Sequence, residues 1–71
     1  MKYFIIKLKD HDLFFNADEG IGEYICDTPM LMDKQQVDAV MKYSDIFYDI
    51  DGVTTYNKDQ VEVREASLQI L

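Results

Sequence analysis

Lysine and arginine are absent between Asp10 and Asp33, although this stretch carries seven carboxylates. The whole chain has 14 acidic residues against 7 basic ones, which gives a formal net charge of −7 at pH 7. Such a negative field attracts basic partners and repels the phosphates of nucleic acids and anionic membranes. We therefore expect neither nucleic acid nor a membrane surface as a direct ligand.

Cysteine, proline and glycine are also scarce. The single cysteine, Cys26, cannot form an intramolecular disulfide or complete a cysteine-based zinc site, and it fits a reducing compartment. No apolar run approaches the roughly 20 residues that a membrane-spanning helix needs. The short apolar run at residues 3–6 is interrupted by Lys7 and Lys9 and lacks a small-residue cleavage site. We expect a cytoplasmic protein without a signal peptide.

The chain is nevertheless rich in the residues that build a core. Apolar residues make up 48% and aromatic residues 13% of its 71 positions, whereas disordered acidic chains are poor in aromatic and β-branched residues. A chain of this length is expected to form one domain, residues 1–71. It buries only about 60% of its unfolded surface, so its margin of stability is small.

Alternation of apolar and polar residues predicts about six short strands. They are expected at residues 2–9, 13–17, 23–27, 46–50, 53–56 and 60–71. Short turns separate the first three, which indicates an antiparallel meander, and Asp51-Gly52 is typical of a type I′ hairpin turn. The last segment also fits a helix capped by Asp59. A strand with a bulge near Arg64 and Glu65 fits more of its alternating residues.

One helix is predicted between the third and fourth strands. Asp33 is a good N-cap, and Gln36 three residues later completes a capping box. Apolar residues then recur at helical spacing, as at Val37 and Val40, which predicts a helix over 34–43 with one apolar face. A helix this short is unstable alone and must pack on the sheet. The predicted fold is α+β, in the order β-β-β-α-β-β-β, with an antiparallel sheet of about five or six strands and the helix on one face.

Residues suited to catalysis or metal binding are few. Asp10-His11-Asp12 combines the only histidine with two carboxylates, but no second histidine completes a metal site. Asp49-Ile50-Asp51-Gly52 superficially resembles a calcium loop, yet Phe47 and Lys58 would occupy its first and twelfth ligand positions. Cys26 lacks a neighbouring base or cation that would activate its thiol. We therefore expect a protein that is not an enzyme and that binds no metal or cofactor. A small enzyme or metal protein centred on His11 ranks third, after the two binding hypotheses that follow.

The acidic side chains are the main candidates for function. Ordinary solubility also explains net negative charge in small proteins, but these acids lie without neighbouring bases and beside aromatic residues. Acids two apart on a strand, such as Asp49 and Asp51, lie roughly 6.6 Å apart, similar in scale to neighbouring phosphates of a nucleic acid. The predicted partner-binding residues are Asp10, Asp12, Asp18, Glu19, Glu23, Asp49, Asp51, Tyr24, Phe47 and Tyr48. Of the three aromatic anchors, Tyr24 and Tyr48 are alternatively core residues.

A second hypothesis concerns the sheet face opposite the helix. If the helix covers Phe4, Ile6 and Leu8, an apolar patch is left outside, formed by Tyr3, Ile5, Phe14 and Ile25. An apolar patch rimmed by acids often marks an interface, and the edge of the C-terminal strand offers another. The alternative function is therefore a homo-oligomeric structural or accessory protein, with a homodimer as its simplest form.

Three features together describe the type of chain: the start Met1-Lys2-Tyr3-Phe4-Ile5, which enters a strand at once, the helix from Asp33, and the acid-rich hairpin at Asp51-Gly52. In this overall type the chain resembles the small acidic proteins encoded by bacteriophages and mobile elements. That class includes anti-CRISPR proteins, anti-restriction proteins and inhibitors of uracil-DNA glycosylase. The resemblance implies a non-enzymatic inhibitor in the host cytoplasm that binds a basic host protein in place of its nucleic acid.

Overall fold

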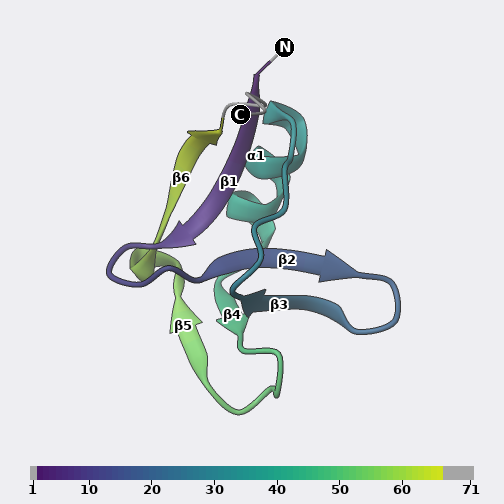
Figure 1. Ribbon diagram of the computed structural model, residues 1–71, viewed down its shortest axis with the longest axis vertical. Coiled ribbons are helices and arrows are strands. Elements are labelled where there is room, and N and C mark those ends of the chain that lie inside the picture. The colour runs from purple at the N-terminus through teal and green to yellow at the C-terminus, as the bar shows by residue number, and fades with distance from the viewer. Residues whose placement is uncertain (1, 67–71) are drawn as a thin grey trace.

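The computed structural model describes residues 2–66. Within this range the order of elements is β1 (Tyr3–Leu8), β2 (Phe14–Asp18), β3 (Gly22–Cys26), α1 (Lys34–Tyr43), β4 (Ile46–Tyr48), β5 (Thr55–Asn57), the 3-10 turn η1 (Lys58–Gln60) and β6 (Val61–Ala66) (Figure 1). The α+β class and the predicted order of strands and helix are confirmed. The strand prediction for the last segment is confirmed at β6, and its remainder, residues 67–71, lies outside the described residues.

The strands of the described range are divided between two sheets. A four-stranded antiparallel sheet has the order β3-β2-β1-β6, and β4 and β5 form a separate pair. β1 pairs with β6 along its whole length, whereas its register with β2 consists of the pair Lys7↔Phe14. The β2–β3 hairpin therefore turns away from β1 and projects to one side of the molecule (Figure 1).

The pairing of β6 with β1 is continuous. Arg64 lies opposite Ile5 and Glu65 opposite Phe4, one residue against one. The bulge predicted near Arg64 and Glu65 is therefore wrong. The core-facing alternation of β6 simply continues to Glu65, where the ladder reaches solvent and a charged residue replaces an apolar one. The change of phase between Val63 and Ala66, which suggested the bulge, arises because Glu65 shares the side of Val61 and Val63 while Ala66 lies on the other side.

Helix α1 begins at the predicted capping box. Asp33 Oδ1 accepts a hydrogen bond from Gln36 N at 2.8 Å, and Gln36 Oε1 accepts one from Asp33 N at 3.0 Å. The helix spans Lys34–Tyr43 as predicted, and Val37 on its apolar face is buried. Between residues 2 and 66 no helix has the length and apolar character needed to cross a bilayer.

The core lies between the four-stranded sheet, α1 and β4. Its side chains are at most 4% exposed, and they are Ile6, Leu8, Phe15, Ile25, Met32, Val37, Phe47 and Val61. Phe15 of β2 and Phe47 of β4 meet edge to face with ring centroids 5.8 Å apart, which joins the two sheets. Ile25 was predicted in the outer apolar patch, and this is wrong. It lies opposite Phe15 in the β2–β3 register and therefore shares its core-facing side.

The turn between β4 and β5 is longer than predicted. Asp49 N donates to Thr54 O and Gly52 N donates to Asp49 O, both at 2.8 Å. A type I′ turn needs positive φ at both central residues, but Gly52 has φ +76° while Asp51 does not have a positive φ. The type I′ prediction is therefore wrong. Gly52 instead takes the left-handed position that follows a turn of ordinary φ, where its missing Cβ removes the steric penalty.

Candidate functional site

The ten predicted site residues fall into two groups. Asp10 and Asp12 lie in the β1–β2 turn, and the other eight belong to the β2–β3 and β4–β5 hairpins. The β1–β2 turn and the tip of the β2–β3 hairpin lie at opposite ends of β2 (Figure 1). The structure therefore does not bring the seven predicted carboxylates together in one array. We call the larger group, without Phe47, the hairpin surface, and its members are Asp18, Glu19, Glu23, Tyr24, Tyr48, Asp49 and Asp51.

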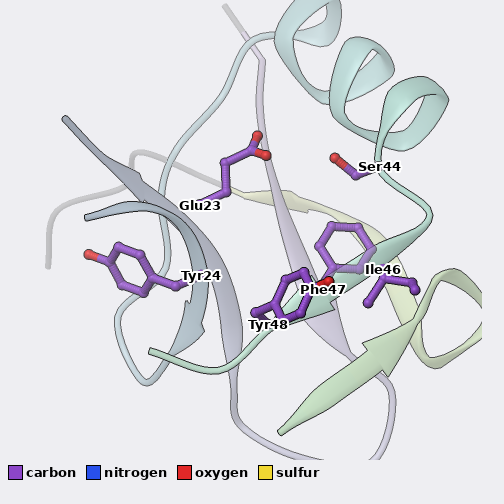
Figure 2. Close-up of a pocket in the computed structure, with 6 residues that line it drawn as sticks. All are labelled: Glu23, Tyr24, Ser44, Ile46, Phe47 and Tyr48. Atoms are coloured by element: carbon purple, nitrogen blue, oxygen red, sulfur yellow. The ribbon is translucent and has the colours of Figure 1, made fainter. Parts of the chain in front are cut away.

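The two hairpins meet along β3 and β4. Ile25 and Asp49 form a parallel bridge between the hairpins. Beside this bridge lies a pocket of about 200 Å³ (Figure 2), lined by Glu23, Tyr24, Ser44, Ile46, Phe47 and Tyr48. Four of the predicted site residues thus line one cavity. They come from two strands, β3 and β4, that are far apart in the sequence and belong to different sheets.

Figure 2 shows how these side chains lie. Glu23 from β3 and Ser44 from the end of α1 extend toward one another across the pocket, with Phe47 between β4 and the helix. Tyr48 lies at the front, and Tyr24 extends to the other side of β3 with its hydroxyl directed away from the pocket. This arrangement follows from alternation along β3, which turns Glu23 toward the core side and Tyr24 toward the outer face of the sheet.

Phe47 is a core residue rather than a surface anchor. Its side chain is 3% exposed and its ring packs against Phe15. The prediction that Phe47 anchors a partner is therefore wrong, because the packing of β4 on the main sheet turns this position inward. Tyr48, the next residue of β4, points outward and is 49% exposed. Of the predicted aromatic anchors, Tyr48 is the one that a partner can reach most easily.

The predicted acids form no ion pair with any residue of the described range. The ion pairs there join Lys2 to Glu65, Lys34 to Asp38, Lys58 to Asp45 and Arg64 to Glu62. The Lys7 ammonium instead donates to the carbonyl oxygens of Leu8 and His11, and the Lys42 ammonium lies 5.3 Å from the centre of the Tyr43 ring. The predicted acids thus keep their charge without a salt-bridge partner in this part of the chain.

Several acids of the hairpin surface are held by their own turns. Their carboxylates accept hydrogen bonds from backbone N–H groups one or two residues ahead, an arrangement typical of aspartate in turns. The bonds run from Gly20 N to Asp18 Oδ1 (2.9 Å), from Ile50 N to Asp49 Oδ1 (2.6 Å) and from Val53 N to Asp51 Oδ1 (2.9 Å). The strand spacing predicted for Asp49 and Asp51 is wrong, since Asp51 lies in the turn. The charges are nevertheless fixed relative to the backbone.

Tyr24 lies on the hairpin surface in partly buried surroundings with Asp18 nearby. Partial burial raises the pKa of its phenol above the ordinary value of 10.0, and the nearby Cys26 and Asp18 add to the rise. Asp18 lies on the same face of the hairpin as Tyr24, because Tyr24 is the register partner of Asn16, two residues before Asp18 in β2.

The other end of β2 has a different character. Asp10 and His11 contribute to a second pocket of about 170 Å³, whose lining also includes Lys9, Asp59 and Tyr56. This lining mixes both signs of charge, unlike the first pocket. Within residues 2–66, no three histidine, cysteine or acidic side chains lie close enough together to hold a metal ion.

Sequence reasoning missed Ser44 and Ile46 as lining residues, and it also missed exposed apolar residues beside the acids. Ser44 fits the helical stripe of α1, and Ile46 fits the alternation of β4, so neither pattern distinguishes these residues from core positions. The exposed apolar residues lie in the two hairpin turns and are Ile21, Ile50 and Val53. Their occurrence inside turn sequences, where polar residues are usual, is the signal that could have identified them.

A comparison with protein-family models, with curated proteins and with solved structures finds no match to this chain. The likeness to small acidic inhibitors therefore stays a prediction from the overall type of the sequence. The hairpin surface itself, with its charges, its exposed rings and its pocket, is the basis for a functional assignment.

Proposed function

We propose that this chain is a non-enzymatic inhibitor that docks its hairpin surface on the nucleic-acid-binding region of a basic host protein, in the host cytoplasm. The observation that carries the proposal is a set of acids without an ion-pair partner in the described range. Of these, Glu23 lines a pocket together with the exposed ring of Tyr48, and Asp49 follows Tyr48 in the chain. Uncompensated charge speeds association with a basic partner, and a desolvated aromatic contact slows dissociation.

The fixed positions of the carboxylates support the same proposal. Asp18, Asp49 and Asp51 are hydrogen-bonded to their own turns, so they lose little further freedom when a partner binds. Preorganised groups bind more tightly than mobile ones for this reason. A set of fixed negative charges can occupy a basic groove as the phosphates of a nucleic acid strand would.

The proposed contact involves fewer acidic residues than the sequence predicts. Asp10 and Asp12 lie at the opposite end of β2 from the tip of the β2–β3 hairpin. Interactions between exposed charges are screened beyond about 8 Å at physiological ionic strength. The two acids of the β1–β2 turn therefore add to the overall field and lie outside the docking contact.

The proposal is tested by capture and competition. The immobilised chain is exposed to bacterial lysate at low salt, and retained proteins are eluted with duplex DNA, with RNA or with rising salt. One variant reverses three charges of the hairpin surface, and a matched variant reverses three charges at the other end of β2. The first carries Asp18→Lys, Glu19→Lys and Glu23→Lys, and the second carries Asp10→Lys, Asp12→Lys and Asp59→Lys.

We expect the wild type and the matched variant to retain a nucleic-acid-binding protein that DNA or RNA displaces, and the hairpin variant to lose it. Equal loss in both variants would show that overall charge, and not the hairpin surface, attracts the protein. Retained proteins that neither nucleic acid displaces would overturn the proposal. Circular dichroism of both variants establishes that each is folded.

A second candidate function is a homo-oligomer, and one observation favours it. Tyr3, Ile5 and Phe14 share the outer face of the four-stranded sheet, opposite the face that α1 covers. Tyr24 and Cys26 extend this apolar face across β3. Sedimentation velocity at micromolar concentration distinguishes the two functions, since a dimer is expected from this candidate and a strict monomer contradicts it.

A further inference from the structure

The pocket between β3 and β4 has the size of a site for one side chain. Its volume of about 200 Å³ lies below the roughly 300–1,000 Å³ typical of sites for small molecules and cofactors. It also lies within the hairpin surface, where a docked partner would cover it. A side chain projecting from that partner is therefore a better occupant than a free metabolite.

The electrostatics of the pocket favour a cation. Glu23 is the one charged residue among the six that line it, and its carboxylate forms no ion pair with another described residue. Ser44, on the opposite wall, is the C-cap of α1, and its backbone N–H donates to Val40 O at 2.9 Å. The C-terminal end of a helix carries partial negative charge. The Glu23 carboxylate thus makes one wall negative, and the helix end adds a partial negative charge that Lys42 in the last turn of α1 reduces.

The other residues that line the pocket favour arginine over lysine as the cationic side chain that it receives. Aromatic rings of Phe47 and Tyr48 and the apolar side chain of Ile46 form much of the wall (Figure 2). A guanidinium group is planar, stacks on aromatic faces and is more weakly hydrated than an ammonium group. Its fork of N–H donors also matches the two oxygens of a carboxylate such as Glu23. Lysine offers a compact charge that holds its water more strongly.

We propose that this pocket receives an arginine side chain of the partner protein, with the guanidinium paired to Glu23 and stacked on Tyr48. The proposal rests on the proposed function, because the arginine belongs to the basic surface on which the hairpin surface docks. It names the contact by which that partner is recognised.

The test is an NMR titration of the isotope-labelled chain with the capped tripeptide Gly-Arg-Gly at constant ionic strength. The matched probes are the same tripeptide with lysine, and with citrulline, which keeps the shape of arginine but carries no charge. We expect saturable shifts at the amides of β3 and β4 with the arginine probe, weaker binding of the lysine probe, and no saturable shifts with the citrulline probe.

Two variants locate the binding. Glu23→Gln removes the carboxylate, and we expect it to weaken binding of the arginine probe about fivefold, the upper end for an exposed ion pair. Tyr48→Ala is expected to weaken it by a similar factor, since an exposed cation–π contact has about the same strength. Asp59→Asn is the control, because it removes one charge outside the hairpin surface, and the affinity should stay within twofold.

Three outcomes would overturn the inference: no saturable shift at β3 and β4, equal affinity for the arginine and lysine or citrulline probes, or equal weakening by Glu23→Gln and Asp59→Asn. Its failure is distinguishable from failure of the docking function. If the arginine probe does not bind while DNA still displaces a captured protein, the pocket inference falls and the docking proposal stands. If the probe binds while no captured protein is displaced by DNA or RNA, the docking proposal falls.

Discussion

Acidic side chains have different partners in two parts of the molecule: the part built from α1, β1 and β6, and the two hairpins. In the first part acids pair with bases, as in Lys34–Asp38 and Arg64–Glu62. In the hairpins, acids such as Asp18 bond to their own backbone, and the pair Lys58–Asp45 lies only at the base of β4 and β5. Exposed ion pairs stabilise a fold by roughly 0–1 kcal/mol each, so the difference matters more for the external field than for stability.

The comparison shows that the net charge of −7 is unevenly distributed over the fold. Pairing reduces the field around the helix and β6, and the hairpins keep theirs. A locally concentrated field guides an approaching basic partner to that part of the molecule, whereas an even distribution would only keep the protein soluble. Substitutions confined to one part leave the other part as a reference.

The largest effect is expected from breaking the link between the two sheets. Phe47→Ala removes the ring that packs on Phe15, which should cost about 3–5 kcal/mol of unfolding free energy. That is a large share of the roughly 4–11 kcal/mol available to a chain of this size. Urea denaturation measures the loss, and Tyr48→Ala in the same strand is the control, expected within about 0.5 kcal/mol. Equal losses would contradict the inward placement of Phe47.

A smaller effect is expected within the compensated part. Asp33→Ala removes the carboxylate that accepts from Gln36 N, and it should lower the unfolding free energy by about 1 kcal/mol. The control is Asp38→Ala, which removes an exposed pair with Lys34 and should cost about 0.3–0.5 kcal/mol. Urea midpoints rank the two variants. A control loss as large as that of Asp33→Ala would mean that charge, and not capping, stabilises this helix.

The smallest effect compares two matched charge reversals. Glu19→Lys places a positive charge among unpaired acids and should raise the unfolding free energy slightly, by less than about 0.5 kcal/mol. Glu65→Lys breaks the pair with Lys2 and should lower it by a similar amount. Both changes should shrink in 1 M salt, where the Debye length is about 3 Å. Thermal unfolding at low and high salt measures them, and shifts of the same sign would contradict the division into two parts.

Much of the fold was predictable because its signals are local. The capping box of Asp33 and Gln36 defines the start of α1 within a few residues of sequence, and alternation identifies the strands. The division into two sheets was not predictable in this way. It depends on β4 pairing with β5 while Phe47 packs on Phe15, and both are contacts between segments distant in the chain. Alternation shows which residues share a face and leaves open which face is buried, so Phe47 and Ile25 were misplaced.

The features of the candidate site also differ in whether they depend on local sequence or on contacts between distant segments. The lack of bases near the acids is a property of composition, and it persists in the fold. The pocket requires Glu23 and Ser44 to meet across two elements, and nothing in either segment indicates the other. The separation of Asp10 and Asp12 from the remaining acids follows from the length and direction of β2. A count of charges along the sequence carries no information on this separation.

The attachment of the β2–β3 hairpin to β1 through the register pair Lys7↔Phe14 bears on how this protein can change over evolution. Residues at the hairpin tip belong neither to the β1–β6 ladder nor to the buried core. At the tip, position 22 favours glycine, because its φ of +96° is a conformation that other residues rarely adopt. Tip residues such as Glu19 and Ile21 can therefore be exchanged while the scaffold is retained, and a lineage under pressure from a varying target could diversify there first.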